Sequence, residues 1–298
     1  MIGVRFKGRL GNQLFQYAAA RSVAERLNCP LVVTDFARGR NLRRVRRALH
    51  LELREVFPNA TVAPATHALE ALGGISARAY RAAMSRMLPR RFTPRKVLSG
   101  GVLSSDAFDP AIREVSPGTL LEGFFQSEAY FADRREDVRR WFAPAERTTA
   151  RVGALLEPIA SDLPTYVAVH VRLGDYQRHA LQVGGRAYPY VLDRAYYAAA
   201  IDMFPRDTPI ALFSDEPEMA AELLPRPAEW VAPDADPFVT LLALATFSKI
   251  VTANSSFSWW AAWLGGPDNV VIAPRFHIGH AAGIWHPYSV AVDRWTYV

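Results

Sequence analysis

The stretch Tyr166–Tyr176 reads YVAVHVRLGDY, a short apolar run that passes directly into polar residues. An unbroken apolar run of this length is typical of a strand that is buried on both faces, as in a parallel sheet. In open α/β sheets, ligands bind beyond the carboxyl ends of the strands. The stretch therefore predicts a buried parallel strand with a binding site at its end.

Two other predicted strands also end in polar residues. Ile210–Phe213 leads into Ser214–Glu216, and Ile250–Ala253 leads into Asn254–Ser256. The second of these polar clusters opens a predicted helix, Phe257–Leu264. Because the carboxyl ends of parallel strands share one edge of a sheet, the three polar clusters predict a single pocket.

The chemistry of these clusters suits a diphosphate. The planar guanidinium of Arg172 can bind two phosphate oxygens and stays protonated at any working pH. Ser255 and Ser256 lie at a helix N-terminus, where phosphate is favoured, although either hydroxyl can instead serve as an N-cap. Gly174 allows a sharp turn, and Asp175 either orients Arg172 or accepts a proton.

The first part of the chain predicts a second parallel sheet. Ile2–Phe6 alternates like a strand, Gly8–Asn12 is a turn, Leu14–Leu27 has helical spacing and Leu31–Val33 is a second strand. This succession begins an open α/β sheet. The turn precedes a helix and is therefore placed to approach phosphate, although it has neither the dinucleotide fingerprint nor a P-loop.

A break at Asp162–Pro164 suggests two domains, 1–160 and 161–298, which suits a chain of 298 residues of which half are apolar. The strand Leu120–Phe125 is assigned to the first domain and the strand Val270–Ala273 to the second. The further predicted helices are Ala129–Trp141, Asp193–Phe204, one beginning at Pro217, and one that Asp236 caps and that runs to Thr246.

Composition narrows the function classes. A single cysteine, Cys29, excludes an intrachain disulfide and a thiolate metal cluster, and favours a reducing, cytoplasmic setting. We find no signal peptide and no apolar run long enough to span a membrane. The net charge of +6 comes from arginines within 38–47 and 78–95. They form either a solvated surface or a contact for an anionic membrane or ligand; no nucleic-acid motif accompanies them.

No metal site is predicted. The Asp-x-Asp sequence Asp234–Asp236 precedes a helix, so we interpret Asp236 as its cap. The aromatic residues Trp259 and Trp263 share a helix face and are expected in the core, whereas Phe257, nearest the strand end, is expected to touch ligand.

Five segments resemble, in family order, the bacterial α-1,2-fucosyltransferases of glycosyltransferase family 11. They are Gly8–Ala18 (GRLGNQLFQYA), Gly123–Glu128 (GFFQSE), His170–Tyr176 (HVRLGDY), Phe213–Asp215 (FSD) and Ala253–Leu264 (ANSSFSWWAAWL).

The resemblance implies a GT-B-like α/β architecture of two Rossmann-like domains with parallel sheets and a donor cleft between them. It implies inverting, metal-independent transfer of fucose from GDP-fucose to the 2-hydroxyl of a β-galactoside, with the donor on the second domain and the acceptor on the first. The acceptor is then a galactose-terminated oligosaccharide or a lipid-linked glycan. The basic clusters of the chain would allow peripheral contact with the inner membrane face, where a lipid-linked glycan is reached. The segment 38–100 matches no part of the family pattern, and acceptor recognition is expected there.

The predicted catalytic residues are Asp175, Arg172 and His170, and Asp175 is the first candidate for the base, with His170, His179 and Asp35 open. Asp215 is expected to bind the guanine or the ribose. The predicted donor-binding residues are Gly11, Asn12, Gln13, Arg172, Gly174, Tyr176, Ser214, Asp215, Asn254, Ser255, Ser256 and Phe257.

Two other functions fit the same residues. One is transfer from a different sugar nucleotide by an enzyme of the same architecture. The other is a non-catalytic module that binds a glycan or a nucleotide.

Overall fold

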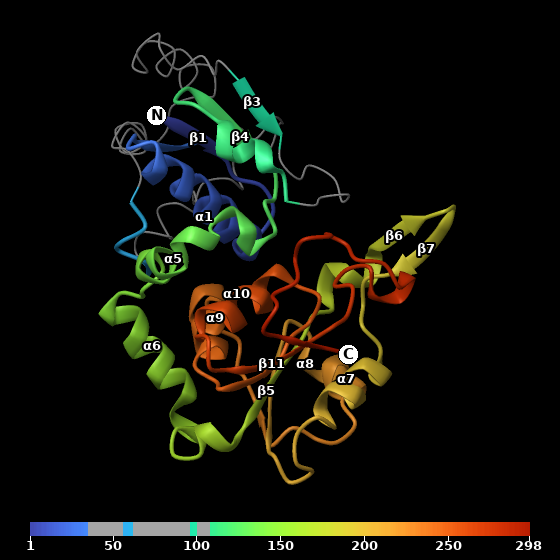
Figure 1. Ribbon diagram of the computed structural model, residues 1–298. Coiled ribbons are helices and arrows are strands. Elements are labelled where there is room, and N and C mark those ends of the chain that lie inside the picture. Colours follow the sequence, from blue (N-terminus) through green and yellow to red (C-terminus); the bar gives the residue numbers. More distant parts are fainter. Residues whose placement is uncertain (35–55, 62–95, 100–107) are drawn as a thin grey trace, which may run out of the picture. The chain divides into compact units, whose positions relative to one another are not determined.

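A computed structural model describes residues 1–34, 56–61, 96–99 and 108–298. The chain forms two compact units, Met1–Ala145 and Glu146–Val298, and each contains a parallel sheet with helices packed on it (Figure 1). The predicted α/β class with two Rossmann-like parallel sheets is therefore confirmed.

The first unit is built around β1 (Ile2–Arg5). This strand pairs in parallel with β2 (Leu31–Thr34) on one side and β4 (Thr119–Glu122) on the other, and β3 (Lys96–Ser99) pairs with β4. The helix α1 (Leu10–Arg26) connects β1 to β2 and buries most of its length. This is the strand, turn, helix and strand succession expected from the sequence.

The second unit contains a six-stranded parallel sheet, ordered β12-β11-β10-β5-β8-β9. Its helices α9 and α10 pack together on one side of the sheet, and α7 and α8 lie on the other (Figure 1). The strands are β5 (Val167–Val171), β8 (Ile210–Ser214), β9 (Trp230–Val231), β10 (Lys249–Val251), β11 (Val270–Ala273) and β12 (Thr296–Tyr297), and the helices are α7 (Arg194–Ile201), α8 (Pro217–Leu223), α9 (Pro237–Ala245) and α10 (Ser256–Leu264).

The other elements are short. A hairpin of β6 (Ala180–Val183) and β7 (Arg186–Pro189) projects from the second unit (Figure 1). The others are η2 (Pro110–Glu114), η3 (Glu128–Tyr130), η4 (Ala132–Arg134), α5 (Arg135–Trp141), α6 (Glu146–Leu156), η5 (Glu157–Ile159), η6 (Leu163–Thr165), η7 (Gly174–Arg178) and η8 (His280–Ala282).

One predicted helix was wrong in its extent. Ala129–Trp141 is two 3₁₀ turns followed by α5, because Phe131 (φ −141°) and Arg134 (φ −133°) leave the helical region. The units also divide after Ala145, whereas the sequence break suggested residue 160. The reason is α6, which packs against α9 and so belongs to the second unit.

The core of the second unit depends on aromatic residues of α10. Trp260 and Trp263 are fully buried, and Trp259 is nearly so. The rings of Trp259 and Trp263 are stacked, with their centroids 6.2 Å apart, as expected for residues four apart on one helix face. The core position predicted for these residues is confirmed, and it fixes α10 on the sheet.

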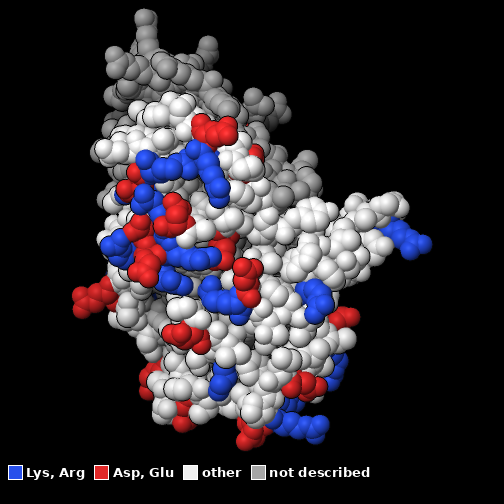
Figure 2. All heavy atoms as spheres, viewed as in Figure 1, with Lys and Arg blue, Asp and Glu red and all other residues white. Residues whose placement is uncertain are grey.

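The face in Figure 2 does not present a single sign of charge. Basic and acidic side chains alternate around α5, where Arg134 and Asp137, and Arg135 and Glu128, pair at 2.9 Å. The arginines predicted to form basic clusters, within 38–47 and 78–95, lie outside the described residues. Within the described part of the chain, no helix has the length and apolar character needed to cross a membrane.

Replacing Trp263 by alanine is expected to lower the free energy of unfolding by about 3–5 kcal/mol, because it leaves a large cavity under α10. Urea unfolding followed by circular dichroism measures the change. Met219→Ala is the control, since Met219 is 47% exposed, and its effect is expected within about 0.5 kcal/mol. Equal effects of the two substitutions would contradict the core assignment.

Candidate functional site

The three polar clusters of the second unit lie at the carboxyl ends of neighbouring strands. In the sheet β5 lies between β8 and β10, and all three strands are parallel. His170 is paired in register with Phe213, and Val171 with Ser214. The structure therefore brings the clusters His170–Tyr176, Ser214–Glu216 and Asn254–Ser256 to one edge of the sheet.

This edge contains the topological switch point of the sheet. The chain runs from β5 to β8 and β9 on one side, then returns to β10, β11 and β12 on the other. Because the connections leave β5 and β10 in opposite directions, these two strand ends flank the position where ligands of open α/β sheets bind. We call this position the crevice. The loop after β5 and the start of α10 border it.

Arg172 is held between two carboxylates at this edge. One of its terminal nitrogens lies 2.5 Å from Oδ2 of Asp215, and the other pairs with Oδ1 of Asp175. Its guanidinium carbon is also 5.5 Å from the centre of the Tyr176 ring. The side chain of Arg172 is 15% exposed, so the guanidinium is oriented by its neighbours but still reaches solvent.

Asp215 also orders the backbone of the loop after β5. Its Oδ1 accepts a hydrogen bond of 3.0 Å from the amide of Leu173. Gly174 follows with a φ of +27°, and a Cβ at this position would overlap Oδ2 of Asp215. Glycine is therefore required here both for its backbone conformation and for the close approach of the carboxylate.

His170 is buried and packed against Phe257. The two rings are stacked with centroids 5.5 Å apart, and His170 is 5% exposed. Burial first, and the charge of Arg172 second, lower the pKa of His170 to about 3, so its ring is neutral near pH 7. A neutral buried imidazole positions Phe257 at the crevice; its catalytic role stays a prediction.

The start of α10 is joined to the loop after β5 by hydrogen bonds. Ser255 is the N-cap, since its Oγ accepts from the amide of Phe257 at 3.3 Å. The hydroxyl of Tyr176 donates to the carbonyl of Asn254 at 3.2 Å, and the side-chain amide of Asn254 donates to the carbonyl of Tyr190 at 2.7 Å. These bonds fix the two borders of the crevice relative to each other.

The hydroxyls at the other predicted positions differ in their surroundings. Ser214 accepts a hydrogen bond from the amide of Glu216 at 3.0 Å, whereas Ser256 is the first residue of α10 and is half-buried. Both lie at the edge of the sheet where the sequence placed them.

Sequence reasoning missed Tyr190. Its ring lies 5.5 Å from that of Tyr176 and 6.1 Å from that of His179. It follows the hairpin β6–β7, whose turn residues Gly184 and Gly185 both have positive φ. A Gly-Gly pair between two short runs is a hairpin signal, so the sequence did contain the means to find it.

Two candidates for the base can be compared with Asp175. Nδ1 of His179 lies 2.6 Å from the carbonyl oxygen of Asp175, which can only accept, so Nδ1 donates a hydrogen bond to it. The side chain of His179 is exposed. Asp35, the remaining candidate, lies outside the described residues.

The turn Gly8–Asn12 of the first unit is internally bonded. Gly8 has a φ of +72°, and its carbonyl accepts from the side-chain amide of Gln13 at 2.9 Å. Oδ1 of Asn12 accepts from the side-chain amide of Gln126 at 2.6 Å, which joins the end of β1 to the end of β4. Gly11 is buried in the first turn of α1. The turn is shaped by these bonds, and its contact with a donor stays a prediction.

Metal ligands do not gather in the described parts of the chain, where no group of three or more His, Cys, Asp or Glu side chains could hold an ion. Asp236, from the Asp-x-Asp sequence, accepts a hydrogen bond from the amide of Phe238 at 2.9 Å. The interpretation of Asp236 as a helix cap is confirmed.

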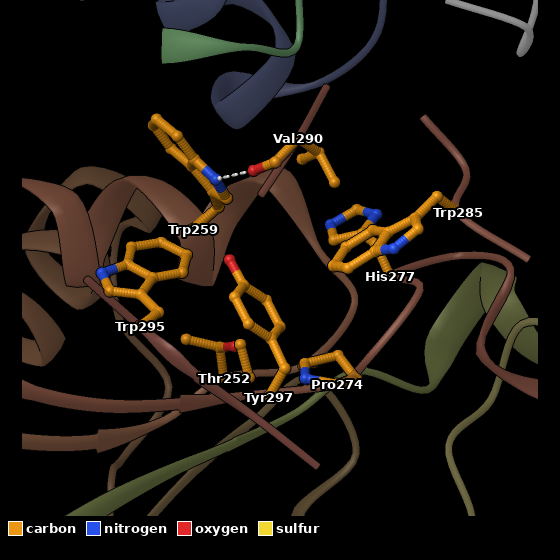
Figure 3. A pocket seen from close by; sticks show the side chains of 10 residues that line it. Thr252, Trp259, Pro274, His277, Trp285, Val290, Trp295 and Tyr297 are labelled. Atoms are coloured by element: carbon orange, nitrogen blue, oxygen red, sulfur yellow. Dashed lines mark hydrogen bonds between the residues drawn. The ribbon is translucent and has the colours of Figure 1, made fainter. Parts of the chain in front are cut away.

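A separate small cavity lies beyond β10 and β11 (Figure 3). Its walls include Trp259, Trp285 and Tyr297, together with His277, whose two ring nitrogens have no hydrogen-bond partner among the described residues. The cavity has room for roughly one water molecule and not for a nucleotide. Burial lowers the pKa of His277 to about 3.

The fold and the site define an α/β protein with polar and charged side chains gathered at the switch point of its second sheet. The family profile described as "Glycosyl transferase family 11" matches residues 114–282, which is more than half of the chain. The chain belongs to this family.

Named relatives support the same family. The chain is 25% identical to the O-antigen biosynthesis glycosyltransferase WbnK of Escherichia coli, over 90% of this chain and 92% of that protein. It is 28% identical to an α-1,2-colitosyltransferase of Escherichia coli, over 61% of this chain and 64% of that protein. It is 30% identical to the human galactoside α-(1,2)-fucosyltransferase 1, over 53% of this chain and 46% of that protein.

Solved structures that match the chain include the NodZ α-1,6-fucosyltransferase soaked with GDP-fucose. It has 15% identity and a TM-score of 0.46, over 88% of this chain and 92% of that one. POFUT1 in complex with GDP has 13% identity and a TM-score of 0.49, over 99% of this chain and 97% of that one.

The two buried histidines predict how stability changes with pH. Their folded pKa values of about 3 lie below the ordinary 6.5, so the unfolded chain takes up protons that the folded chain cannot. Stability is therefore lost as pH falls from 6.5 towards 3. Each histidine is expected to lower the free energy of unfolding by about 2 kcal/mol when the pH falls from 7.5 to 5.

Urea unfolding at pH 7.5 and pH 5 tests this for the parent protein and for His277→Phe, which fills the same aromatic surroundings. Between pH 7.5 and pH 5, the free energy of unfolding of His277→Phe is expected to fall by about 2 kcal/mol less than that of the parent protein. An unchanged loss would show that His277 titrates normally in the folded protein.

Proposed function

We propose that this chain is an inverting α-1,2-fucosyltransferase that transfers L-fucose from GDP-fucose to the 2-hydroxyl of a β-galactoside in a glycan. The observation that supports the proposal is that Arg172 lies at the switch point, in a loop that is joined to the start of α10 by the Tyr176–Asn254 hydrogen bond. A guanidinium and a helix start at one crevice can bind a diphosphate together. The names of the family relatives support the transferred sugar and the linkage.

In this proposal the second unit binds the donor. Arg172 binds the diphosphate, and Gly174 and Tyr176 shape the loop that carries it. The residues that complete the donor site are Ser214, Asp215, Asn254, Ser255, Ser256 and Phe257. Gly11, Asn12 and Gln13 of the first unit are the remaining residues that we propose for donor binding.

The reaction needs in-line attack by the acceptor. The oxygen of the 2-hydroxyl forms a bond to the anomeric carbon of fucose as the bond from that carbon to the diphosphate oxygen breaks. GDP leaves with the electron pair, and the hydroxyl proton passes to a base, for which Asp175 is our candidate. Arg172 and the start of α10 stabilise the charge that develops on the leaving diphosphate.

The acceptor and the location follow from the same proposal. A galactose-terminated oligosaccharide or a lipid-linked glycan would be the acceptor, in the cytoplasm or at the inner membrane face. Co-sedimentation with anionic vesicles at low salt tests the membrane contact; a chain that stays in the supernatant would exclude it.

The activity is tested by incubation with GDP-fucose, GDP-mannose and UDP-sugars against an array of galactosides, followed by linkage analysis of the products. We expect transfer from GDP-fucose and an α-1,2 product. Nucleotide binding without transfer would favour a non-catalytic module. The colitosyltransferase relative gives weight to a second donor, and transfer from another sugar nucleotide alone would replace fucose in the proposal.

Arg172→Ala is expected to raise the barrier by about 2.7–4 kcal/mol, which lowers turnover about a hundredfold to a thousandfold, since one charge-stabilising donor is lost. Steady-state kinetics with GDP-fucose measure it. The control is Arg275→Ala, because Arg275 lies after β11 and bonds to the carbonyl of Tyr297. Near-normal turnover of Arg172→Ala would remove Arg172 from the mechanism.

A further inference from the structure

Two carboxylates share the single guanidinium of Arg172, and their surroundings differ. Asp215 lies at the end of β8, is 28% exposed and uses both oxygens, one for Arg172 and one for the amide of Leu173. Asp175 lies within η7, three residues from Arg172, and is 37% exposed. The two ion pairs are therefore not equivalent.

The contacts of Asp215 tie it to the framework of the second unit. It joins β8 to the loop after β5, and Gly174 leaves the space that its carboxylate occupies. It also lies close to the core: burial first, and the charge of Asp215 second, raise the pKa of Tyr197, which is 1% exposed. Movement of Asp215 would disturb the loop backbone and the guanidinium together.

The side chain of Asp175 is the more exposed of the two, at 37% against 28% for Asp215. Its carboxylate pairs with the other terminal nitrogen of Arg172. With both carboxylates in place, the three side chains carry a net charge of −1, which disfavours an anion. A diphosphate that binds the terminal nitrogens of Arg172 competes with these carboxylates, and the side chain more exposed to such a competitor is that of Asp175.

We infer that Asp215 is a positioning residue that keeps Arg172 oriented, and that Asp175 is an exchangeable counter-ion whose place the donor diphosphate takes. The inference rests on the proposed function, in which Arg172 binds the diphosphate. It gives Asp215 a different role from the guanine or ribose contact expected from the sequence. It also links donor binding to the release of the carboxylate that we propose as the base.

The test measures GDP binding by titration calorimetry for the parent protein, Asp175→Asn and Asp215→Asn. Both substitutions remove one negative charge, so charge alone predicts tighter binding for both. The inference predicts opposite signs: about fivefold tighter binding for Asp175→Asn, because an exposed competitor is lost, and about tenfold weaker binding for Asp215→Asn, because Arg172 loses its orientation.

Asp268→Asn is the matched control. Asp268 is exposed and precedes β11, at the amino edge of the sheet, so its removal changes the net charge equally without touching Arg172. GDP binding by this variant is expected to equal that of the parent. If both site variants bound GDP more tightly, or both more weakly, the distinction between the two carboxylates would be overturned.

A second nucleotide separates positioning from base recognition. If Asp215 acts through Arg172, Asp215→Asn weakens the binding of ADP and of GDP by the same factor. In a protein that already carries Arg172→Ala, Asp215→Asn causes no further loss of affinity. A loss confined to GDP would show that Asp215 reads the guanine and would overturn the inference. Should Asp215→Asn fail to fold, as judged by its thermal transition, Asp215→Ser, which keeps an acceptor for the Leu173 amide, replaces it.

Failure of the proposed function is recognised separately. If the parent protein does not bind GDP, or Arg172→Ala binds it equally well, the diphosphate site itself is wrong. If Arg172→Ala binds GDP weakly while the two aspartate variants shift in the same direction, only the division of roles is wrong.

Discussion

The ion-pair cluster at the end of β5 is the constraint on which the site depends. A guanidinium that is mostly buried must be paired, and Asp215 meets this requirement from the neighbouring strand β8. The same carboxylate accepts a hydrogen bond from the amide of Leu173, so one side chain sets both the orientation of Arg172 and the path of the loop. The loop can be short because Gly174 lets the chain turn against this carboxylate.

The other border of the crevice is fixed by packing. The tryptophans of α10 anchor this helix on the sheet, and the stacking of His170 on Phe257 joins its first turn to β5. Hydrogen bonds from Tyr176 and Asn254 complete the link. Ion pairs therefore position the loop after β5 on one side of the crevice, and aromatic packing positions the start of α10 on the other. A diphosphate would bind between these two elements.

The sequence predicted those parts of the fold that repeat a local pattern. Val167–Val171 is apolar except for His170, and α10 has helical aromatic spacing, so both were found close to their observed bounds. That three strand ends meet at one edge followed from the rule for parallel sheets. The elements missed include the hairpin β6–β7, the helix α6, and the 3₁₀ turns that replace the first half of the helix predicted at 129–141.

The ion pairs of Arg172 were harder to predict from the sequence than the strands. From the sequence, Asp175 was a partner of Arg172 or a base, and Asp215 a guanine or ribose contact. The structure shows that Asp215 also pairs with Arg172, although 42 residues separate it from Leu173, whose amide it holds. Contacts at such separations depend on strand order, which no local pattern reveals. The tight packing at Gly174 is likewise a property of the assembled sheet.

The most direct measurement is a crystal structure of the protein with GDP bound. The account predicts diphosphate oxygens about 3 Å from the terminal nitrogens of Arg172 and from the backbone amides at the start of α10. A diphosphate bound elsewhere on the chain, with Arg172 still enclosed by both carboxylates, would contradict it.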